Sequence, residues 1–114
     1  MIEELLVEAR QQLLDSELER ILPLLEEEYA ADAVYLFGSA ATGDVHQWSD
    51  LDLVIIKETD QRFLDRIKDV IELVQPQVGM DIIVYTPQEF GRLSEERPFV
   101  REEILAKSKV LCAK

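Results

Sequence analysis

The sequence predicts a small domain of the α/β or α+β class. Three short apolar runs have the length of β-strands, and they alternate with segments whose apolar residues recur at the 3.6-residue spacing of amphipathic helices. Helical segments also flank these runs at both ends of the chain. Strands separated by helices are typical of a sheet with helices packed against it. At 114 residues, 47% of them hydrophobic, the chain is expected to form a single domain, 1–114, with its own core.

An N-terminal helical segment is expected over residues 1–30. Apolar residues in 2–14 follow helical intervals, and Ser16 followed by Glu19 is typical of a capping box that opens a second helix. Proline is tolerated in the first turn of a helix but not in its interior. Pro23 therefore either kinks one helix or begins another, and the sequence leaves both open.

The core of the predicted domain spans residues 33–112. Strands are expected over 33–37, 51–57 and 80–85, with a short closing strand over 109–112. Helices are expected as one turn over 40–42 closed by Gly43, from Thr59 or Asp60 to Val74, from the cap Thr86 with Pro87, and from Pro98 to about Lys107.

Charge and cysteine content exclude several classes of protein. Acidic residues outnumber basic ones by 24 to 12, and a net charge of −12 disfavours direct binding to nucleic acid. The charge suits a well-solvated protein or one that docks on a basic partner, and both remain open. The single cysteine, Cys112, excludes a disulfide framework. Without a long apolar run or a basic signal segment, the protein is expected to be cytoplasmic, with no membrane association.

Two short motifs stand beside the first two predicted strands. Gly38 and Ser39 follow the first strand, Asp50 and Asp52 open the second, and ten residues separate the two pairs. Because side chains alternate between the faces of a strand, Asp50 and Asp52 are expected on one face. Such carboxylates repel each other unless a cation lies between them, and Mg²⁺ accompanied by substrate phosphates fills that role.

The Gly-Ser pair is expected to bind phosphate. Gly38 permits a close backbone approach or a positive φ, and Ser39 can cap a helix whose first N–H groups face an anion. Taken alone, each motif is more often a simple turn or a solvated strand start than a site. Their combination beside two strands favours phosphoryl or nucleotidyl transfer.

The motif Gly38-Ser39 followed by Asp50-x-Asp52 resembles the signature of the DNA-polymerase-β-like nucleotidyltransferase superfamily. The short chain resembles a minimal nucleotidyltransferase of that group, with the resemblance covering roughly residues 20–112. The resemblance implies a small mixed sheet with helices packed mainly on one side. It also implies a third acidic residue on a later strand, a position that Asp81 fits.

The resemblance implies ATP as the substrate and one or two Mg²⁺ ions. The implied site residues are Asp50, Asp52 and Asp81 for catalysis and metal binding, and Gly38, Ser39 and Ser49 for nucleotide and phosphate binding. Asp81 would act either as a metal ligand or as the base that accepts the hydroxyl proton. Ser49 would orient its loop and contact Asp50 or phosphate.

One departure from the family pattern concerns the turn after Gly38-Ser39. Relatives often carry a basic residue there, whereas this chain has Ala40-Ala41-Thr42. Triphosphate binding should be weaker unless another cation compensates. The candidates are Lys57, Arg62, and the pair Arg97 and Arg101.

Two residues of the loop before Asp50 have open roles. His46 is expected to be an exposed loop residue, although a role as ligand or base is an alternative. Trp48 could cover the edge of the core or stack on a nucleotide base.

The resemblance also implies a partner. Minimal nucleotidyltransferases are often paired with HEPN-type RNase toxins and act as antitoxins, in known cases by transferring AMP to a toxin tyrosine. A hetero-oligomer with such a toxin is therefore expected. Two alternatives remain: an antitoxin that masks its toxin without catalysis, and an oligomer that modifies a small molecule.

Overall fold

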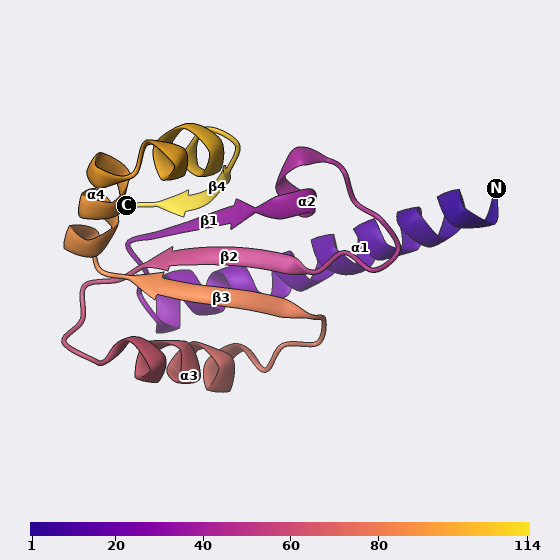
Figure 1. Ribbon diagram of the computed structural model, residues 1–114. Coiled ribbons are helices and arrows are strands. Elements are labelled where there is room, and N and C mark those ends of the chain that lie inside the picture. Colours follow the sequence, from indigo (N-terminus) through magenta and orange to yellow (C-terminus); the bar gives the residue numbers. More distant parts are fainter.

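The computed structural model describes the backbone of residues 1–114 and all side chains except those of Glu103 and Ile104. It confirms the expected fold class, with a four-stranded mixed sheet of order β3-β2-β1-β4 and helices packed against it (Figure 1). The strands are β1 (Ala33–Phe37), β2 (Leu51–Ile56), β3 (Met80–Tyr85) and β4 (Lys109–Ala113). The helical elements are α1 (Ile2–Pro23), α2 (Gly38–Thr42), α3 (Phe63–Val74) and α4 (Pro87–Glu96), with π-helical segments η1 (Leu24–Glu28) and η2 (Val100–Leu105).

The strands run in both directions. β1 pairs antiparallel with β2 on one side and with β4 on the other. β2 and β3 are parallel, and α3 forms the crossover between them. A parallel pair needs such a crossover because the chain must return to the same end of the sheet.

α1 is one continuous helix, so the predicted break at Ser16 was wrong. The segment from Ile2 to Leu22 contains no glycine or proline, and Ser16 lies within the helix, where its exposed side chain is solvated. Pro23 is the last residue of α1, and the chain passes directly into η1 with helical dihedrals. Pro23 therefore marks a change from α-helical to π-helical hydrogen bonding and does not start a separate helix.

The other helix starts agree with the sequence in part. Thr86 caps α4 in a capping box with Glu89, as expected. α3 begins after Arg62, later than the predicted caps, and the hydroxyl of Thr59 instead accepts a hydrogen bond from the Gln61 N–H (3.1 Å) in the preceding turn.

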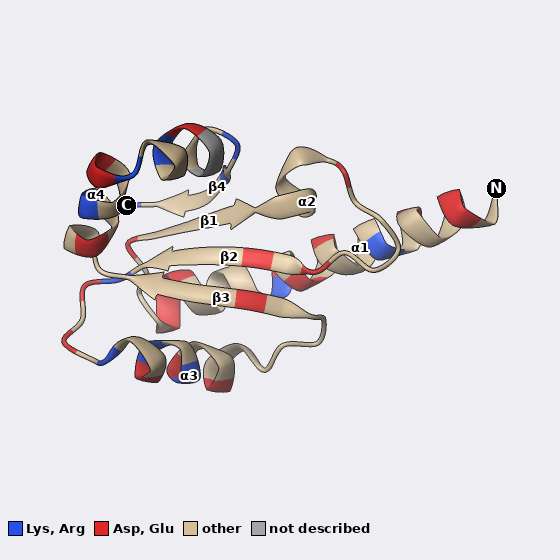
Figure 2. Ribbon diagram, viewed as in Figure 1, with Lys and Arg blue, Asp and Glu red and all other residues tan. Residues whose placement is uncertain are grey.

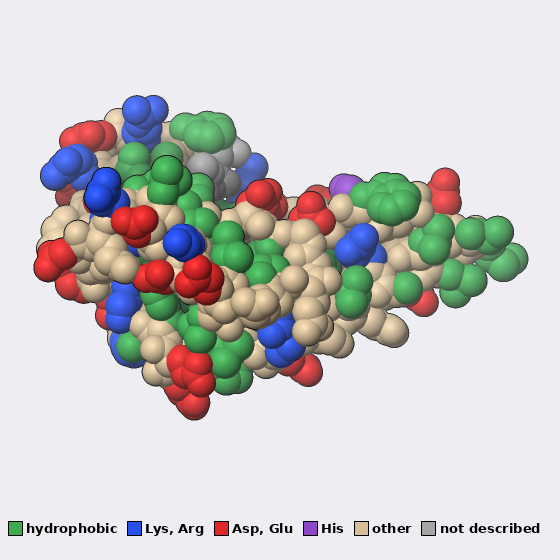
Figure 3. Space-filling model, turned by 90° about the horizontal axis from the view of Figure 1, so that it is seen from below, with side chains coloured by type: hydrophobic (Ala, Val, Ile, Leu, Met, Phe, Trp, Pro, Cys, Tyr) green, Lys and Arg blue, Asp and Glu red, His purple; other side chains and the backbone are tan. Residues whose placement is uncertain are grey.

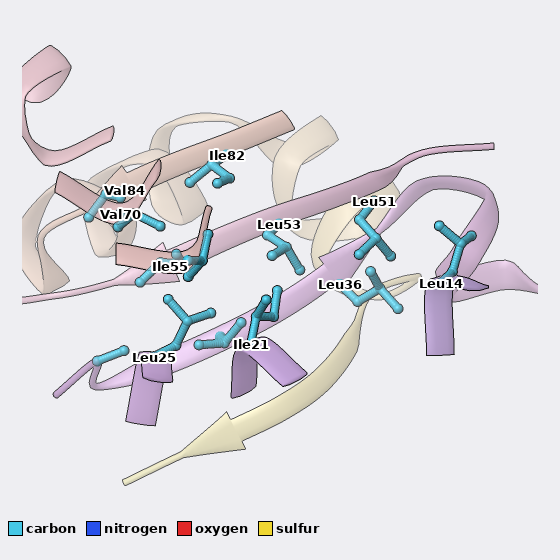
Figure 4. Packing of buried hydrophobic residues seen from close by; sticks show 13 residues of the cluster. Leu14, Ile21, Leu25, Leu36, Leu51, Leu53, Ile55, Val70, Ile82 and Val84 are labelled. Carbon is cyan, nitrogen blue, oxygen red and sulfur yellow. The ribbon is translucent and has the colours of Figure 1, made fainter. Parts of the chain in front are cut away.

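One face of the sheet carries the core. Alternate strand residues point toward α1, η1 and α3, and pack with buried aliphatic side chains of these helices (Figure 4). The strands contribute Val34, Leu36, Leu51, Leu53, Ile55, Ile82 and Val84, and the helices contribute Leu14, Ile21, Leu25, Val70 and Val74. Full burial of such a side chain contributes about 1.5–3 kcal/mol, so this layer is the main source of stability.

The opposite face is covered at one end only. Phe90 of α4 stacks on Tyr35 and Tyr85, with ring centroids 5.5 and 6.2 Å away. Further along the same face, Asp52 is half-buried and Ile83 is exposed. The helices therefore pack mainly against the other side, and part of this face stays open to a ligand.

A buried arginine connects the two layers. Arg66 of α3 donates from Nη1 to the carboxylate of Glu89 (2.7 Å) and to the carbonyl of Val84 (3.2 Å). Glu89 belongs to α4 and Val84 to β3. The arginine thereby holds α3, the outer strand and α4 together at one edge of the sheet.

The start of α1 extends beyond the sheet. We call residues 2–13 of this helix the α1 arm. Figure 1 shows it projecting from the sheet, and Figure 3 shows apolar side chains at its surface. Leu5 and Leu6 are exposed on the arm, and Trp48 of the neighbouring loop is 71% exposed. Leu6, Ala9, Arg10, Leu13, Gln47 and Trp48 line a shallow groove of about 230 Å³. Within the described part of the chain, every helix is too short or too polar to cross a membrane.

Glu17 is a buried carboxylate that ties α1 to the loop before β3. It accepts hydrogen bonds from Arg20 Nε (2.7 Å) and from the Gln77 N–H (2.7 Å), and only 4% of the residue is exposed. These bonds, that of Arg20 above all, lower the pKa of Glu17 although burial acts in the opposite direction.

Glu17→Gln should lower the free energy of unfolding at pH 7 by about 1–3 kcal/mol, because a neutral amide loses the charge-assisted bonds. Stability due to a lowered pKa is fully present above the ordinary carboxyl value and is lost as the pH falls through the folded-state value. The difference in unfolding free energy between the unaltered chain and Glu17→Gln should therefore shrink as the pH falls from 7 to 3. Urea unfolding measures it, with exposed Glu19→Gln as the control. A difference that stays equal at both pH values would contradict the assignment.

Candidate active site

Two carboxyl groups lie side by side on the open face. Asp52 of β2 and Asp81 of β3 are direct partners in the parallel register, and Figure 2 shows the acidic positions adjacent on the two strands. Their carboxyl groups are close enough to act on each other. Burial raises the pKa of Asp52, and the neighbouring carboxyl of Asp81 and the charge of Asp50 raise this pKa further. A pair in this state needs a shared proton or a cation.

Asp50 lies apart from this pair. β2 begins at Leu51, so strand alternation does not govern the direction of the Asp50 side chain. Its carboxylate lies against Gly79, where an added Cβ would be 2.6 Å from Asp50 Cγ. Among the described residues, no three His, Cys, Asp or Glu side chains are grouped to hold a metal ion. The predicted three-carboxylate cluster is thus represented by two members, and Asp50 would have to turn to join them.

Gly38 brings the backbone close to the carboxyl pair. It is the first residue of α2, and its φ of 71° lies in the left-handed region. A Cβ at this position would collide with Asp52 Oδ2 and lie 3.3 Å from Asp52 Cγ. Only glycine allows this approach without displacing the carboxylate, so the expectation of a special backbone at Gly38 is met.

Ser39 and Ser49 join the Gly-Ser turn to the following loop. Ser39 Oγ donates to Ser49 Oγ (2.9 Å), which also accepts from the His46 N–H (2.9 Å). Ser39 does not cap α2 as predicted, because the helix already starts at Gly38 and Phe37 is the capping residue. Ser49 is 2% exposed, so these bonds orient the loop. A phosphate contact by either serine stays a prediction.

A cleft of about 400 Å³ opens beside the carboxyl pair. Its lining consists of Phe37, Gly38, Thr42, Asp52, Leu53, Val54, Asp81, Ile83 and Lys107. The walls are largely apolar, and the charged groups are the two carboxyls and the Lys107 amine. The sequence carries no local signal for Lys107 at this site, because the position of Lys107 depends on the pairing of β4 with β1.

The basic residues expected to compensate for the Ala40-Ala41-Thr42 turn lie outside this lining. Lys57 Nζ donates to the Ala30 carbonyl (3.2 Å) and lies 5.3 Å from the centre of the Tyr29 ring. The Arg62 side chain is 94% exposed, with Nε 3.9 Å from Asp65.

The loop aromatic residues lie outside the cleft as well. Nδ1 of exposed His46 accepts from the Trp48 N–H (3.2 Å), so this imidazole stabilises a turn. Trp48 contributes to the groove on the α1 arm, so the expected stacking of its indole on a nucleotide base in the cleft has no geometric basis.

The fold and the paired carboxyls define a class of protein, the nucleotidyltransferases. A family model described as "Nucleotidyltransferase domain" matches residues 18–111, and the chain belongs to this family. A solved structure from Sulfolobus solfataricus, assigned provisionally as a nucleotidyltransferase, has a similar fold with a TM-score of 0.63 and 23% identity. The likeness covers 76% of this chain and 79% of that chain. No curated protein matches the chain.

The family implies a nucleoside triphosphate substrate and typically a divalent metal. The geometry of the carboxyl pair fits such an ion. Two oxygen ligands on adjacent strands, open toward a cleft, suit a hard cation that completes its shell with water and substrate phosphates. Asp52 and Asp81 would hold the metal, and its positive charge would offset the repulsion between the two carboxyls.

Gly38→Ala should lower nucleotidyl transfer by on the order of 10²-fold, because the new methyl group displaces the Asp52 carboxylate. Gly43→Ala is the matched control. Gly43 also has a positive φ (86°), but a Cβ there would have nothing within 4 Å among the described residues. Both variants carry the backbone strain, and only Gly38→Ala disturbs the site. Equal losses of activity in the two variants would contradict the proposed contact.

Proposed function

We propose that the chain is a Mg²⁺-dependent nucleotidyltransferase that transfers AMP from ATP to a tyrosine hydroxyl of a partner protein. The observation that carries the proposal is the Asp52–Asp81 pair beside Gly38 at the mouth of an open cleft. The resemblance to minimal nucleotidyltransferases supports a HEPN-type toxin as the partner, with this chain as its antitoxin.

The transfer is a displacement at the α-phosphorus of ATP. The acceptor oxygen forms a bond to this phosphorus while the bond to the oxygen that bridges to the β-phosphate breaks, and pyrophosphate leaves. The acceptor proton passes to a base, and Asp81 at the cleft wall is one candidate. Asp52 would hold the metal, with Asp81 as a second ligand where Asp81 does not serve as the base, and the metal would supply charge neutralisation at the phosphates. Gly38 lets the α2 backbone lie near the reacting groups.

The α1 arm supports a protein acceptor. Exposed apolar side chains gathered on one surface, as with Leu5, Leu6 and Trp48, are typical of protein-protein contacts. The net charge of −12 favours a basic partner through long-range attraction.

A second candidate is an antitoxin that acts by binding alone. The position of Asp50 favours it, because this carboxylate lies against Gly79 and leaves two acidic side chains in the cleft lining. A site with fewer carboxylates holds metal and triphosphate less firmly.

Labelled ATP separates these functions. The chain is incubated with Mg²⁺, ATP labelled at the α-phosphate and the product of the neighbouring reading frame, and label is expected on that polypeptide. Asp52→Asn and Asp81→Asn should each lower labelling by about 10²–10³-fold, equivalent to the several kcal/mol that a bound metal contributes. Asp60→Asn, an exposed loop residue, is the control.

Two other outcomes identify the alternatives. If the variant with both Asp52→Asn and Asp81→Asn still neutralises the partner, and the unaltered chain labels nothing, the chain acts by binding alone. If label appears on a small metabolite without any partner, the acceptor is a small molecule.

A further inference from the structure

The cleft has an unbalanced charge. Two carboxyls line it, Asp50 adds its charge nearby, and the whole chain carries a net charge of −12. A nucleotide brings further negative charge in its phosphates. One bound metal offsets part of this charge, and a cation that faces the phosphates would offset more.

Lys107 lies where such a cation is needed. It shares the cleft lining with Gly38, Thr42 and the two carboxyls. Asp81 and Asp52 belong to β3 and β2, whereas Lys107 precedes β4 at the other edge of the sheet. Among the described residues of the lining, it is the one lysine or arginine.

The pairing of β4 with β1 explains this position. Tyr35 pairs with Val110, and Leu36 pairs with Lys109. Lys107 lies in the turn two residues before β4, next to the end of this ladder, and lines the cleft together with Gly38. The turn before β4 carries the blue of basic residues in Figure 2 and faces the end of β1. Gly38 and Lys107, 69 positions apart in the sequence, thus line the same cleft because β4 pairs with β1.

Three arginines near the sheet bind groups outside the cleft. Arg66 is buried against Glu89 and the Val84 carbonyl, and Arg20 pairs with Glu17. Arg10 donates to the Gln47 carbonyl (2.9 Å) beside the α1 arm. None of these three arginines lines the cleft.

We propose that Lys107 pairs with the phosphate groups of the nucleotide in the cleft, in place of a basic residue in the turn after Ser39. This assignment rests on the proposed function and names a binding residue of the same site. A lysine suits the role because its ammonium is a compact charge on a flexible stem that can follow the phosphates. Lys107 is in an exposed turn, so its replacement leaves the core intact.

The test is calorimetric titration with Mg²⁺ and α,β-methylene-ATP, whose bridging carbon blocks transfer. Lys107→Met should bind this nucleotide about 10- to 100-fold more weakly than the unaltered chain, the loss expected for one charge-assisted bond. Lys107→Arg should restore most of the affinity. Lys109→Met is the matched control, since Lys109 is an exposed lysine two residues away that does not line the cleft.

Nucleotides with fewer phosphates test which group is bound. The loss caused by Lys107→Met should be largest for the triphosphate, smaller for AMP and absent for adenosine. An equal loss for all three, or an equal loss in Lys109→Met, would overturn the assignment.

The two proposals fail in different ways. If Lys107→Met binds the nucleotide as tightly as the unaltered chain while Asp52→Asn does not, the Lys107 assignment is wrong and the proposed function stands. If the unaltered chain binds no nucleotide in the presence of Mg²⁺, both are wrong.

Discussion

The site depends on the parallel register of β2 and β3. In this register Asp52 and Asp81 are direct partners, and Ile82 and Val84 point into the core. A shift of one residue would turn Asp81 into the core and expose the apolar side chains. The energy of burying the apolar residues of β3 therefore also holds two mutually repulsive carboxyls together, and a bound metal would relieve this repulsion.

One face of the sheet carries the hydrophobic core, and the other carries the candidate active site. α1, η1 and α3 seal one face with aliphatic side chains. On the other face, the stack of Tyr35, Phe90 and Tyr85 covers one end, and the end that carries Asp52 and Asp81 stays accessible. A rigid layer behind the site is what positions groups for catalysis, because loops alone would not hold them within the needed tolerance.

Local patterns predicted most of the elements. The Gly-Ser and Asp-x-Asp motifs pointed to Gly38 and Asp52, the family resemblance pointed to Asp81, and the alternation of side chains within β2 and β3 places Asp52 beside Asp81. The same rule failed for Asp50, because the strand starts one residue later than the motif. Lys107 could not be predicted as a residue of the cleft, because only the non-local pairing of β4 with β1 brings it there. The continuity of α1 was missed because a serine with a glutamate three residues on occurs inside helices as well as at their starts.

The contact of Arg66 with Val84 has a consequence for association between chains. β3 is the outermost strand on its side, and an outer strand offers unpaired carbonyls to any extended segment that approaches. The guanidinium already occupies the Val84 carbonyl and is anchored by Glu89. A foreign strand that extended the ladder past Val84 would have to displace the hydrogen bond from Arg66, so this contact disfavours edge-to-edge association at that end of β3.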